Sequence, residues 1–302
     1  MAKTLVVLLG PTGVGKTELS LSLAELLGSP ILNCDSRQLF SGLKIGTATP
    51  TDEQQRRIQH FFVSTLPLDA YYSAAQYETD VMQLTSELFQ THDTLLLSGG
   101  SMMYIDAVCH GIDDIPTISE EIRTKVKKDL ETNGLSSLLE ILKEHDPDYY
   151  AVVDKNNTRR IVHAVEVCLM SGQSYTSLRT HTPKKRPFQI LKIGLDRPRE
   201  ELFQRINQRV DQMMQEGLMD EVKQYVSYRH CNALNTVGYK ELLHVLDGEW
   251  ELNMAVERIK KNTRVYAKKQ LTWFRRDESI QWFHPEDKAS IQAYLNQRIH
   301  ES

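Results

Sequence analysis

The sequence has few of the features that mark disulfide-rich, collagen-like or membrane-spanning proteins. Its four cysteines are far apart and form no CxxC pair, which argues against a disulfide framework and a zinc site. Fifteen glycines and ten prolines in 302 residues exclude collagen-like and low-complexity chains. The apolar run at 5–9 is too short to cross a bilayer, and it leads into a glycine-rich turn rather than a cleavage site. We therefore expect a soluble, cytoplasmic protein without a membrane partner.

Enough apolar residues are present to build a folded core. Hydrophobic residues make up 40% of the chain and charged residues 25%, which is the composition of a globular protein. The length suits one large domain or two ordinary ones. The 36 basic and 40 acidic residues leave a net charge of −4, which gives no sign of a nucleic-acid partner by itself.

Strand and helix patterns alternate over the first hundred residues. Short apolar runs at 4–9, 30–34 and 94–98 are typical of strands covered on both faces, and leucines at helical spacing separate the first two. A strand that alternates with helices in this way predicts a parallel α/β sheet. The pattern then becomes helical, charged and rich in leucine over 117–180, before a strand pattern returns at 188–195.

A phosphate-binding motif follows the first strand pattern and opens a helix. Residues 10–17 fit G-x-x-x-x-G-K-[ST], in the structural context that this motif requires. The glycines let backbone N–H groups converge on phosphate oxygens, Lys16 adds a positive charge, and the hydroxyl of Thr17 can ligate Mg²⁺. The alternative is a glycine-rich turn with a chance lysine. The motif predicts a di- or triphosphate site formed by Gly10, Pro11, Thr12, Gly13, Val14, Gly15, Lys16 and Thr17.

These patterns together predict the architecture. We expect an α/β fold whose P-loop NTPase-like parallel sheet core comprises residues 1–111 and 188–302, with C-terminal helices at 199–275 packed back on the sheet. Residues 112–187 should form an inserted all-helical domain, because a strand pattern reappears after them.

Two polar residues follow the other strand patterns and should face the phosphate site. Asp35 follows the second strand and Ser101 the third, and the carboxyl ends of parallel strands line the ligand crevice. Asp35 is therefore a candidate base and Ser101 a hydrogen-bond donor to a phosphate or leaving-group oxygen. A helix cap at Asp35 and a plain turn at Ser101 are the alternatives. The third strand lacks the terminal Asp that holds Mg²⁺ in nucleotide-hydrolysing proteins, and no NKxD motif occurs.

The motifs taken together resemble the bacterial tRNA dimethylallyltransferases. The resemblance covers nearly the whole chain, and its implied reaction is transfer of a dimethylallyl group from dimethylallyl diphosphate to N6 of adenosine 37, which lies 3′ of the anticodon. The implied substrates are tRNAs that read codons beginning with U, recognised at the anticodon stem-loop by a monomer, with Mg²⁺ as cofactor. The matching blocks are 10–17, 35–38, 45–48, 72–76, 99–104, 236–241 and 263–275.

The resemblance also implies a role for each matching position. The P-loop would hold the diphosphate of the prenyl donor rather than ATP, and Arg209 matches an arginine that contacts this diphosphate. Asp35 matches the proposed base on the adenine amine, and Ser101 matches a position, usually Thr, that contacts the bridging oxygen. The positions that match tRNA contacts are Asp35, Ser36, Arg37, Gln38, Ser101, Arg123, Arg159, Arg160, His163, Gly238, Tyr239, Lys240, Lys268, Lys269, Trp273 and Arg275.

The chain departs from the family pattern at a few positions. Thr49 stands where Lys is usual, and Ser64 ends a segment that replaces a histidine–aspartate pair. His163 stands where a second arginine is common, which weakens one implied tRNA contact unless the imidazole is protonated. None of these changes removes the P-loop, the candidate base or the diphosphate arginine.

Three other functions share part of this pattern. A P-loop small-molecule kinase could use the same strand–loop–helix start, but it would not explain a basic C-terminal helix. A prenyltransferase acting on free AMP would share the chemistry without needing an inserted domain. A nucleic-acid-binding NTPase should show the missing strand-end Asp.

The net charge conceals a strongly basic segment. Residues 255–276 contain eight basic residues and one acidic residue, so this stretch carries +7 and the remaining 280 residues sum to −11. Lys260, Arg264 and Lys268 recur at helical spacing on one face. Ile259, Tyr266, Gln270 and Trp273 should pack on another. With the basic clusters at 159–160 and 184–186, this segment predicts two surfaces that grip an RNA stem; a solvated helix face is the alternative.

Overall fold

The computed structural model describes residues 3–180 and 182–300. The chain divides into two compact units, Met1–Cys109 with Arg186–Ser302, and His110–Lys185. Both boundaries of the second unit lie two residues earlier in the sequence than predicted, since residues 112–187 were expected. In the part of the chain that is described, no helix is both long and apolar enough to cross a membrane.

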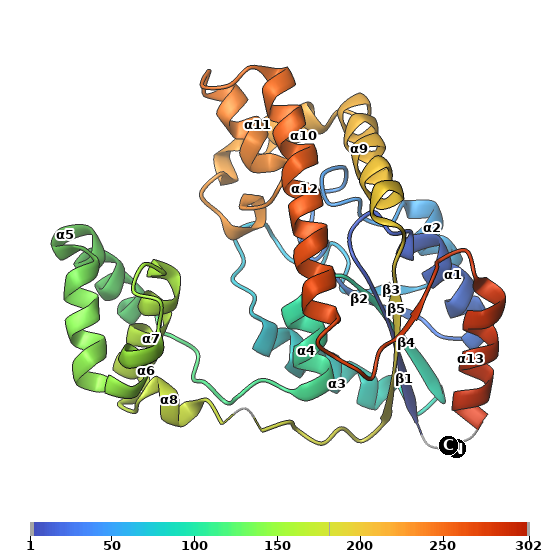
Figure 1. Ribbon diagram of the computed structural model, residues 1–302, viewed down its shortest axis with the longest axis horizontal. Coiled ribbons are helices and arrows are strands. Elements are labelled where there is room, and N and C mark those ends of the chain that lie inside the picture. The colour runs from blue at the N-terminus through green and yellow to red at the C-terminus, as the bar shows by residue number, and fades with distance from the viewer. Residues whose placement is uncertain (1–2, 181, 301–302) are drawn as a thin grey trace. The chain divides into compact units, whose positions relative to one another are not determined.

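A six-stranded parallel sheet forms the centre of the first unit (Figure 1). Its order is β3-β2-β4-β1-β5-β6, and every pair of neighbours is parallel. The parallel α/β sheet predicted from the alternating patterns is therefore confirmed. The strands are β1 (Thr4–Leu9), β2 (Ile31–Cys34), β3 (His60–Phe61), β4 (Thr94–Gly99), β5 (Gln189–Leu195) and β6 (Gln281–Phe283).

Side chains that alternate along β1 build two apolar layers. Leu5, Val7 and Leu9 join a cluster with α3 (Ala74–Leu88) and α4 (Met102–His110). Val6 and Leu8 join the cluster on the opposite face, which is covered by α1 (Lys16–Leu27), α9 (Arg199–Gln215) and α13 (Lys288–His300). Because both faces are covered, all six residues of β1 are buried, as the continuous apolar run predicted.

The C-terminal helices form a third apolar cluster beside the sheet. They are α10 (Leu218–Gln224), α11 (Tyr239–Leu246) and α12 (Leu252–Phe274), which pack with α9 and with Phe40 and Leu43 of the segment after β2. A short helix, α2 (Asp52–Arg57), follows in that segment and contributes no buried residue. Two single-turn helices, Val226–Tyr228 and Asn232–Leu234, link α10 to α11. The long helix α12 runs alongside α9 (Figure 1) and contributes Ala267 and Phe274 to the two sheet layers.

The second unit contains helices and connecting loops, and no strand, among its described residues. It consists of α5 (Glu120–His145), α6 (Pro147–Val152), α7 (Thr158–Ser171) and α8 (Tyr175–Leu178). Its core joins leucines of α5 to Ile161 and Val165 of α7, and α5 is kinked at Gly134, where φ is 77°. The carboxylate of Asp146 is buried; it caps α6 through Tyr149 N at 2.9 Å and accepts from Thr176 N at 2.7 Å.

Candidate functional site

The register of the sheet brings three functional loops to one edge. Leu9 pairs with Gly99, and Gly99 pairs with Cys34 on its other side, so the last residues of β1, β4 and β2 lie in one row. The next residues along each strand begin the P-loop, the Gly100–Ser101 turn and the Asp35 turn. Segments 25 to 90 residues apart in the sequence therefore emerge side by side, as expected for the carboxyl edge of a parallel sheet.

The P-loop connects β1 to α1 in the conformation that an anion site needs. Gly15 is the N-cap of α1 with φ 109°, a backbone conformation that favours glycine, and no side chain caps the helix. The first N–H groups of α1 therefore lack intrahelical partners and are available to an anion. The ammonium of Lys16 donates to Gly10 O and Pro11 O, both at 2.8 Å, which holds it inside the loop.

Lys16, Asp35 and Arg209 form the charged centre of the site. Burial lowers the pKa of Lys16 to about 8; Asp35 opposes this change and Arg209 adds to it. Burial also lowers the pKa of Arg209, which comes from α9, and the negative charge of Asp35 opposes that change. Within the described residues, the guanidinium of Arg209 donates no hydrogen bond. Its N–H groups are therefore available to an anionic ligand.

Asp35 organises a turn rather than a helix start. Its Oδ1 accepts from Arg37 N at 2.9 Å, and the predicted alternative of a helix cap is not what the structure contains. Ser101 is 8% exposed, and its Oγ accepts from Ser36 N at 2.8 Å and donates to Ser36 Oγ at 3.2 Å. The hydroxyl of Ser101 thus joins the turn after β4 to the turn that carries Asp35.

Gln38 closes the Asp35 turn against the next loop. Its Nε2 donates to Thr47 O and Ala48 O, both at 3.0 Å, so the amide is engaged within the protein. Thr49, which stands where the family usually has Lys, is hydrogen-bonded to Thr47 Oγ1 at 2.8 Å and donates to Leu43 O at 3.1 Å. It therefore stabilises the same loop. Ser64, another position that differs from the family pattern, donates its backbone N–H to Gln38 O at 2.8 Å.

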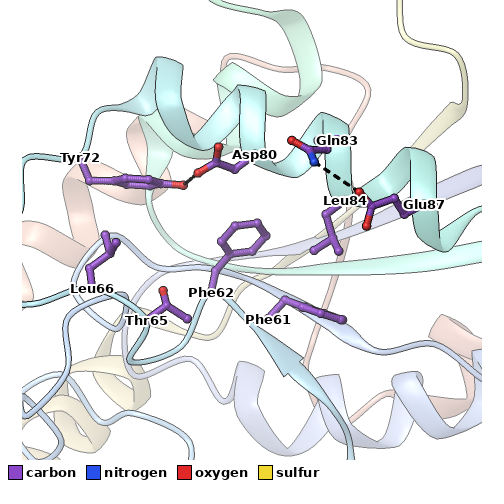
Figure 2. A pocket seen from close by; sticks show the side chains of 9 residues that line it. All are labelled: Phe61, Phe62, Thr65, Leu66, Tyr72, Asp80, Gln83, Leu84 and Glu87. Atoms are coloured by element: carbon purple, nitrogen blue, oxygen red, sulfur yellow. Dashed lines mark hydrogen bonds between the residues drawn. The ribbon is translucent and has the colours of Figure 1, made fainter.

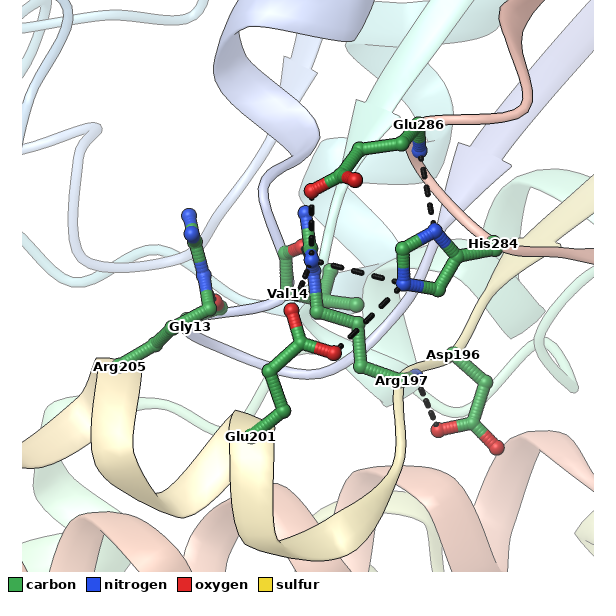
Figure 3. Close-up of polar contacts among 8 residues, drawn as sticks. All are labelled: Gly13, Val14, Asp196, Arg197, Glu201, Arg205, His284 and Glu286. Carbon is green, nitrogen blue, oxygen red and sulfur yellow. Dashed lines mark hydrogen bonds and ion pairs between the residues drawn. The ribbon is translucent and has the colours of Figure 1, made fainter.

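Two arginines that the sequence analysis missed support the P-loop from outside (Figure 3). Arg197 Nε donates to Val14 O at 2.8 Å, and Arg205 Nε donates to Gly13 O at 3.1 Å. Arg197 is 8% exposed and is held by Glu201 and by Glu286, the latter at 3.0 Å. Arg197 follows β5 at the same sheet edge, so the strand-end argument used for Asp35 could have found it.

The side chain of Tyr239, which the family resemblance places among the tRNA contacts, is engaged within the protein. Tyr239 is fully buried, and its hydroxyl donates to Glu221 Oε1 at 2.6 Å. The same carboxylate accepts from the N–H groups of Lys44, Ile45 and Gly46 at 2.8–3.0 Å. Gly238 is buried as well, which leaves Lys240 as the exposed side chain of this block. Through Glu221, the buried Tyr239 therefore helps to fix the loop at 44–46.

We expect Tyr239→Phe to lower the free energy of unfolding by about 1–3 kcal/mol, because a buried hydrogen bond to a carboxylate is lost. Chemical denaturation measures this change, and Tyr228→Phe, at a partly exposed tyrosine, is the matched control. The affinity for RNA should stay unchanged. If Tyr239→Phe has normal stability and binds RNA more weakly, Tyr239 contacts RNA directly.

The basic face of α12 differs from the one predicted. Lys260 forms ion pairs with Asp211 of α9 at 2.8 Å and with Glu257 at 3.0 Å. Arg264 donates to Asn207, also of α9, so this part of the predicted stripe packs on a neighbouring helix. Lys268, the third residue of the predicted stripe, is exposed. Lys261 and Lys269, each one residue after a stripe position, are exposed as well.

The apolar face of α12 is also shifted from the prediction. Ile259 and Gln270 are buried as expected, but Tyr266 is 38% exposed. Burial raises the pKa of Tyr266 to about 12, with Asp35 as the next cause, so this ring lies near the candidate base. Trp273 donates Nε1 to Asp106 at 2.8 Å, which ties α12 to α4. Arg275 pairs with Asp196 at 2.6 Å and remains largely exposed.

The helical unit carries the other predicted tRNA residues. Arg159 and Arg160 are exposed in the first turn of α7, and Arg123 lies on α5. The ring of His163 packs edge-on against Tyr175 with centroids 5.5 Å apart. Partial burial, followed by the positive charges of Arg123 and Arg179, lowers the pKa of His163. This direction disfavours the protonated imidazole that would be needed to match the charge of an arginine.

A pocket of about 410 Å³ lies between β3, the loop after it and α3 (Figure 2). Its wall is mostly apolar, and Tyr72 donates to Asp80 at 2.6 Å on one side. None of its lining residues belongs to the predicted site. The lining residues are Phe61, Phe62, Thr65, Leu66, Tyr72, Asp80, Gln83, Leu84 and Glu87.

Sequence comparison connects this site to known proteins. A family model described as IPP transferase matches residues 38–277. A tRNA dimethylallyltransferase 1 from Bacteroides fragilis is 57% identical over 298 residues, which covers 99% of both chains. Another from Bacteroides thetaiotaomicron is 59% identical over 97% of this chain and 95% of that protein. The family model begins after Asp35, whereas these relatives span the P-loop as well.

Solved structures resemble the chain in the same way. A tRNA isopentenylpyrophosphate transferase from Bacillus halodurans superimposes with a TM-score of 0.73 at 31% identity, covering 99% of this chain and 97% of that one. A eukaryotic dimethylallyltransferase, described as acting on tRNA, superimposes with a TM-score of 0.77 at 26% identity. That match covers 90% of this chain and 70% of the other.

Proposed function

We infer the activity from one premise: this chain belongs to the IPP transferase family, and it is an enzyme that transfers a dimethylallyl group to tRNA. We propose that the donor is dimethylallyl diphosphate and that the acceptor atom is N6 of adenosine 37, in tRNAs that read codons beginning with U. Membership of this family decides against a small-molecule kinase and against an NTPase that only binds nucleic acid.

The arrangement of charges at the strand ends is the observation that carries this proposal. The negative charge of Asp35 acts to raise the pKa of both Lys16 and Arg209, and Arg209 acts to lower that of Lys16, so the three groups are near enough for their charges to interact. Two cations beside the open N-terminus of α1 suit a diphosphate. A carboxylate at the edge of that anion site suits a base that acts on an uncharged acceptor approaching the donor carbon.

The reaction can be written with these groups. The lone pair of N6 forms a bond to C1 of the donor as the bond from C1 to the diphosphate oxygen breaks, and the N6 proton passes to Asp35. Negative charge accumulates on the departing diphosphate, where Lys16, Arg209 and the loop N–H groups stabilise it. Ser101 can turn its hydroxyl from Ser36 toward the bridging oxygen.

The donor set also fits Mg²⁺. Thr17 is exposed at the first turn of α1, and its hydroxyl makes no hydrogen bond within the described residues. Mg²⁺ commonly takes few protein oxygens and fills its octahedron with substrate phosphate oxygens and water, so one hydroxyl beside the diphosphate site is sufficient. When bound, the ion would neutralise part of the charge on the diphosphate.

The acceptor must be presented as an unstacked base. Sequence-specific recognition of RNA uses single-stranded loops, and an enzyme that modifies a base takes it out of its stack. The exposed lysines Lys261 and Lys269 on α12 suit phosphate contacts, and Arg159 and Arg160 supply further positive charge on the helical unit. Since P-loop, base and diphosphate arginine come from one chain, we propose that a cytoplasmic monomer carries the whole site.

Transfer of label decides between acceptors. Labelled dimethylallyl diphosphate is incubated with the protein and Mg²⁺, and with either an unmodified anticodon stem-loop containing adenosine 37 or free AMP. We expect label in the stem-loop alone, and none when adenosine 37 is replaced by guanosine. Label in AMP would support the smaller acceptor, and label in neither would contradict the proposal.

A further inference from the structure

Gln270 of α12 connects the two glycine-rich loops of the site. Its side chain is buried, with 2% of the residue exposed, and it lies on the opposite side of the helix from solvent. Gln270 Oε1 accepts from Thr12 N in the P-loop at 2.9 Å. Gln270 Nε2 donates to Gly100 O in the turn after β4 at 2.7 Å. One amide therefore bridges two loops that are far apart in the sequence.

The chemistry of the two partners fixes the orientation of this amide. Thr12 N–H can only donate, so it must face Oε1, and Gly100 O can only accept, so it must face Nε2. A Cβ at position 100 would lie 2.6 Å from Gln270 Nε2 and 3.6 Å from Lys16 Nζ. Glycine at position 100 therefore permits the close approach of the amide.

The bridge also limits which N–H groups of the P-loop can contact an anion. Because Thr12 N is bound to Gln270, it is withdrawn from the set that can contact an anion. Val14 N is bound to Pro11 O at 3.3 Å. An anion is left with the N–H groups of Gly13 and Gly15 and with those at the open start of α1.

We propose that Gln270 is a positioning residue for the donor. It sets the separation between the P-loop, which holds the diphosphate, and the Gly100–Ser101 turn, which is bonded to the Asp35 turn through Ser36. The amide thereby fixes the distance between the leaving group and the base. This inference rests on the proposed function. It assigns Gln270 a role inside the protein, although the family resemblance places Lys269 and Trp273, on either side of it in the sequence, among the tRNA contacts.

Two substitutions separate the halves of the bridge. Gln270→Met keeps the volume and removes both hydrogen bonds. Gln270→Glu keeps an acceptor for Thr12 N but places an ionised oxygen against Gly100 O. Because misplacement of reacting groups by about 1 Å can cost roughly 100-fold in rate, we expect kcat to fall about 10- to 100-fold in both variants. We expect the affinity for the anticodon stem-loop to be unchanged, and Gln90→Met, at an exposed glutamine, to behave as wild type.

The pH profile supplies a signature that a loss of packing would not produce. A protonated glutamic acid can donate to Gly100 O, so the activity of Gln270→Glu relative to wild type should rise as the pH is lowered from 8 to 6, while Gln270→Met shows no such rise. The inference is overturned if both variants keep the wild-type kcat, or if stem-loop affinity falls in step with kcat. Failure of the wild type itself to label the stem-loop would instead contradict the proposed function.

Discussion

Replacing Asp35 with asparagine should reduce the rate of prenyl transfer by about 100- to 10,000-fold, the range typical for loss of a general base. The amide is a poor proton acceptor, so N6 must lose its proton without help as the new bond forms. The fold should be preserved, because the asparagine oxygen can still accept from Arg37 N as Asp35 Oδ1 does at 2.9 Å. Single-turnover transfer to the anticodon stem-loop is the measurement.

The control for this variant must remove one negative charge elsewhere. Asp69 is exposed and forms no hydrogen bond or ion pair within the described residues, so Asp69→Asn changes the net charge equally without touching the site. Stem-loop affinity should be similar in both variants and in wild type. If Asp35→Asn turns over at a near-normal rate, Asp35 is a turn-forming or binding residue and not the base.

Replacing Lys16 with methionine should weaken the binding of dimethylallyl diphosphate by about 10- to 100-fold, which corresponds to one or two charge-assisted hydrogen bonds. Methionine keeps the apolar stem in its buried position, so the loss can be assigned to the ammonium. Calorimetric titration with the donor and Mg²⁺ measures the change. Lys223→Ala, at an exposed lysine paired with Asp220, is the control.

The same comparison has a dependence on pH with a defined sign. The pKa of Lys16 is lowered to about 8 because burial disfavours the charged form, so the donor-free protein loses this positive charge as the pH rises through 8. An anionic donor favours the charged form, and above pH 8 its binding must take up a proton. Wild-type affinity for the donor should therefore fall above pH 8, and the methionine variant should lack that fall. If the affinities of wild type and the methionine variant fall in the same way above pH 8, a group other than Lys16 causes the pH dependence.

The long, fully buried elements could be predicted from sequence. The apolar runs at 4–9 and 94–98 became β1 and β4 because a parallel strand covered on both faces must be apolar throughout. The P-loop followed from its spacing and its neighbours. The edge strands β3 and β6 could not be predicted, since two or three residues show no periodicity and take their hydrogen bonds from the strand beside them.

The candidate site was predictable where the argument concerned strand ends, and less so where it concerned helix faces. Asp35, Ser101 and the P-loop lie at one sheet edge as expected, although their roles remain predictions. Lys260 and Arg264 do lie on one helix, but the sequence pattern of that helix could not show that they face α9. Asp211 and Asn207 of α9 bind them there. Gln270 was expected to pack, but its bridge between two loops could not be predicted, because a bridging side chain is recognised only through its distant partners.

The place where the second unit interrupts the chain has a consequence for synthesis on the ribosome. Lys184 N donates to His110 O at 2.7 Å, so the inserted unit begins and ends at one point. The central strand β1 needs β5, since Thr4 pairs with Gln189, and this pairing must wait until the whole insertion has been translated. Local helix contacts form early and distant strand pairing late. The helical unit should therefore fold first, while β1 and the nascent P-loop remain without their final neighbour.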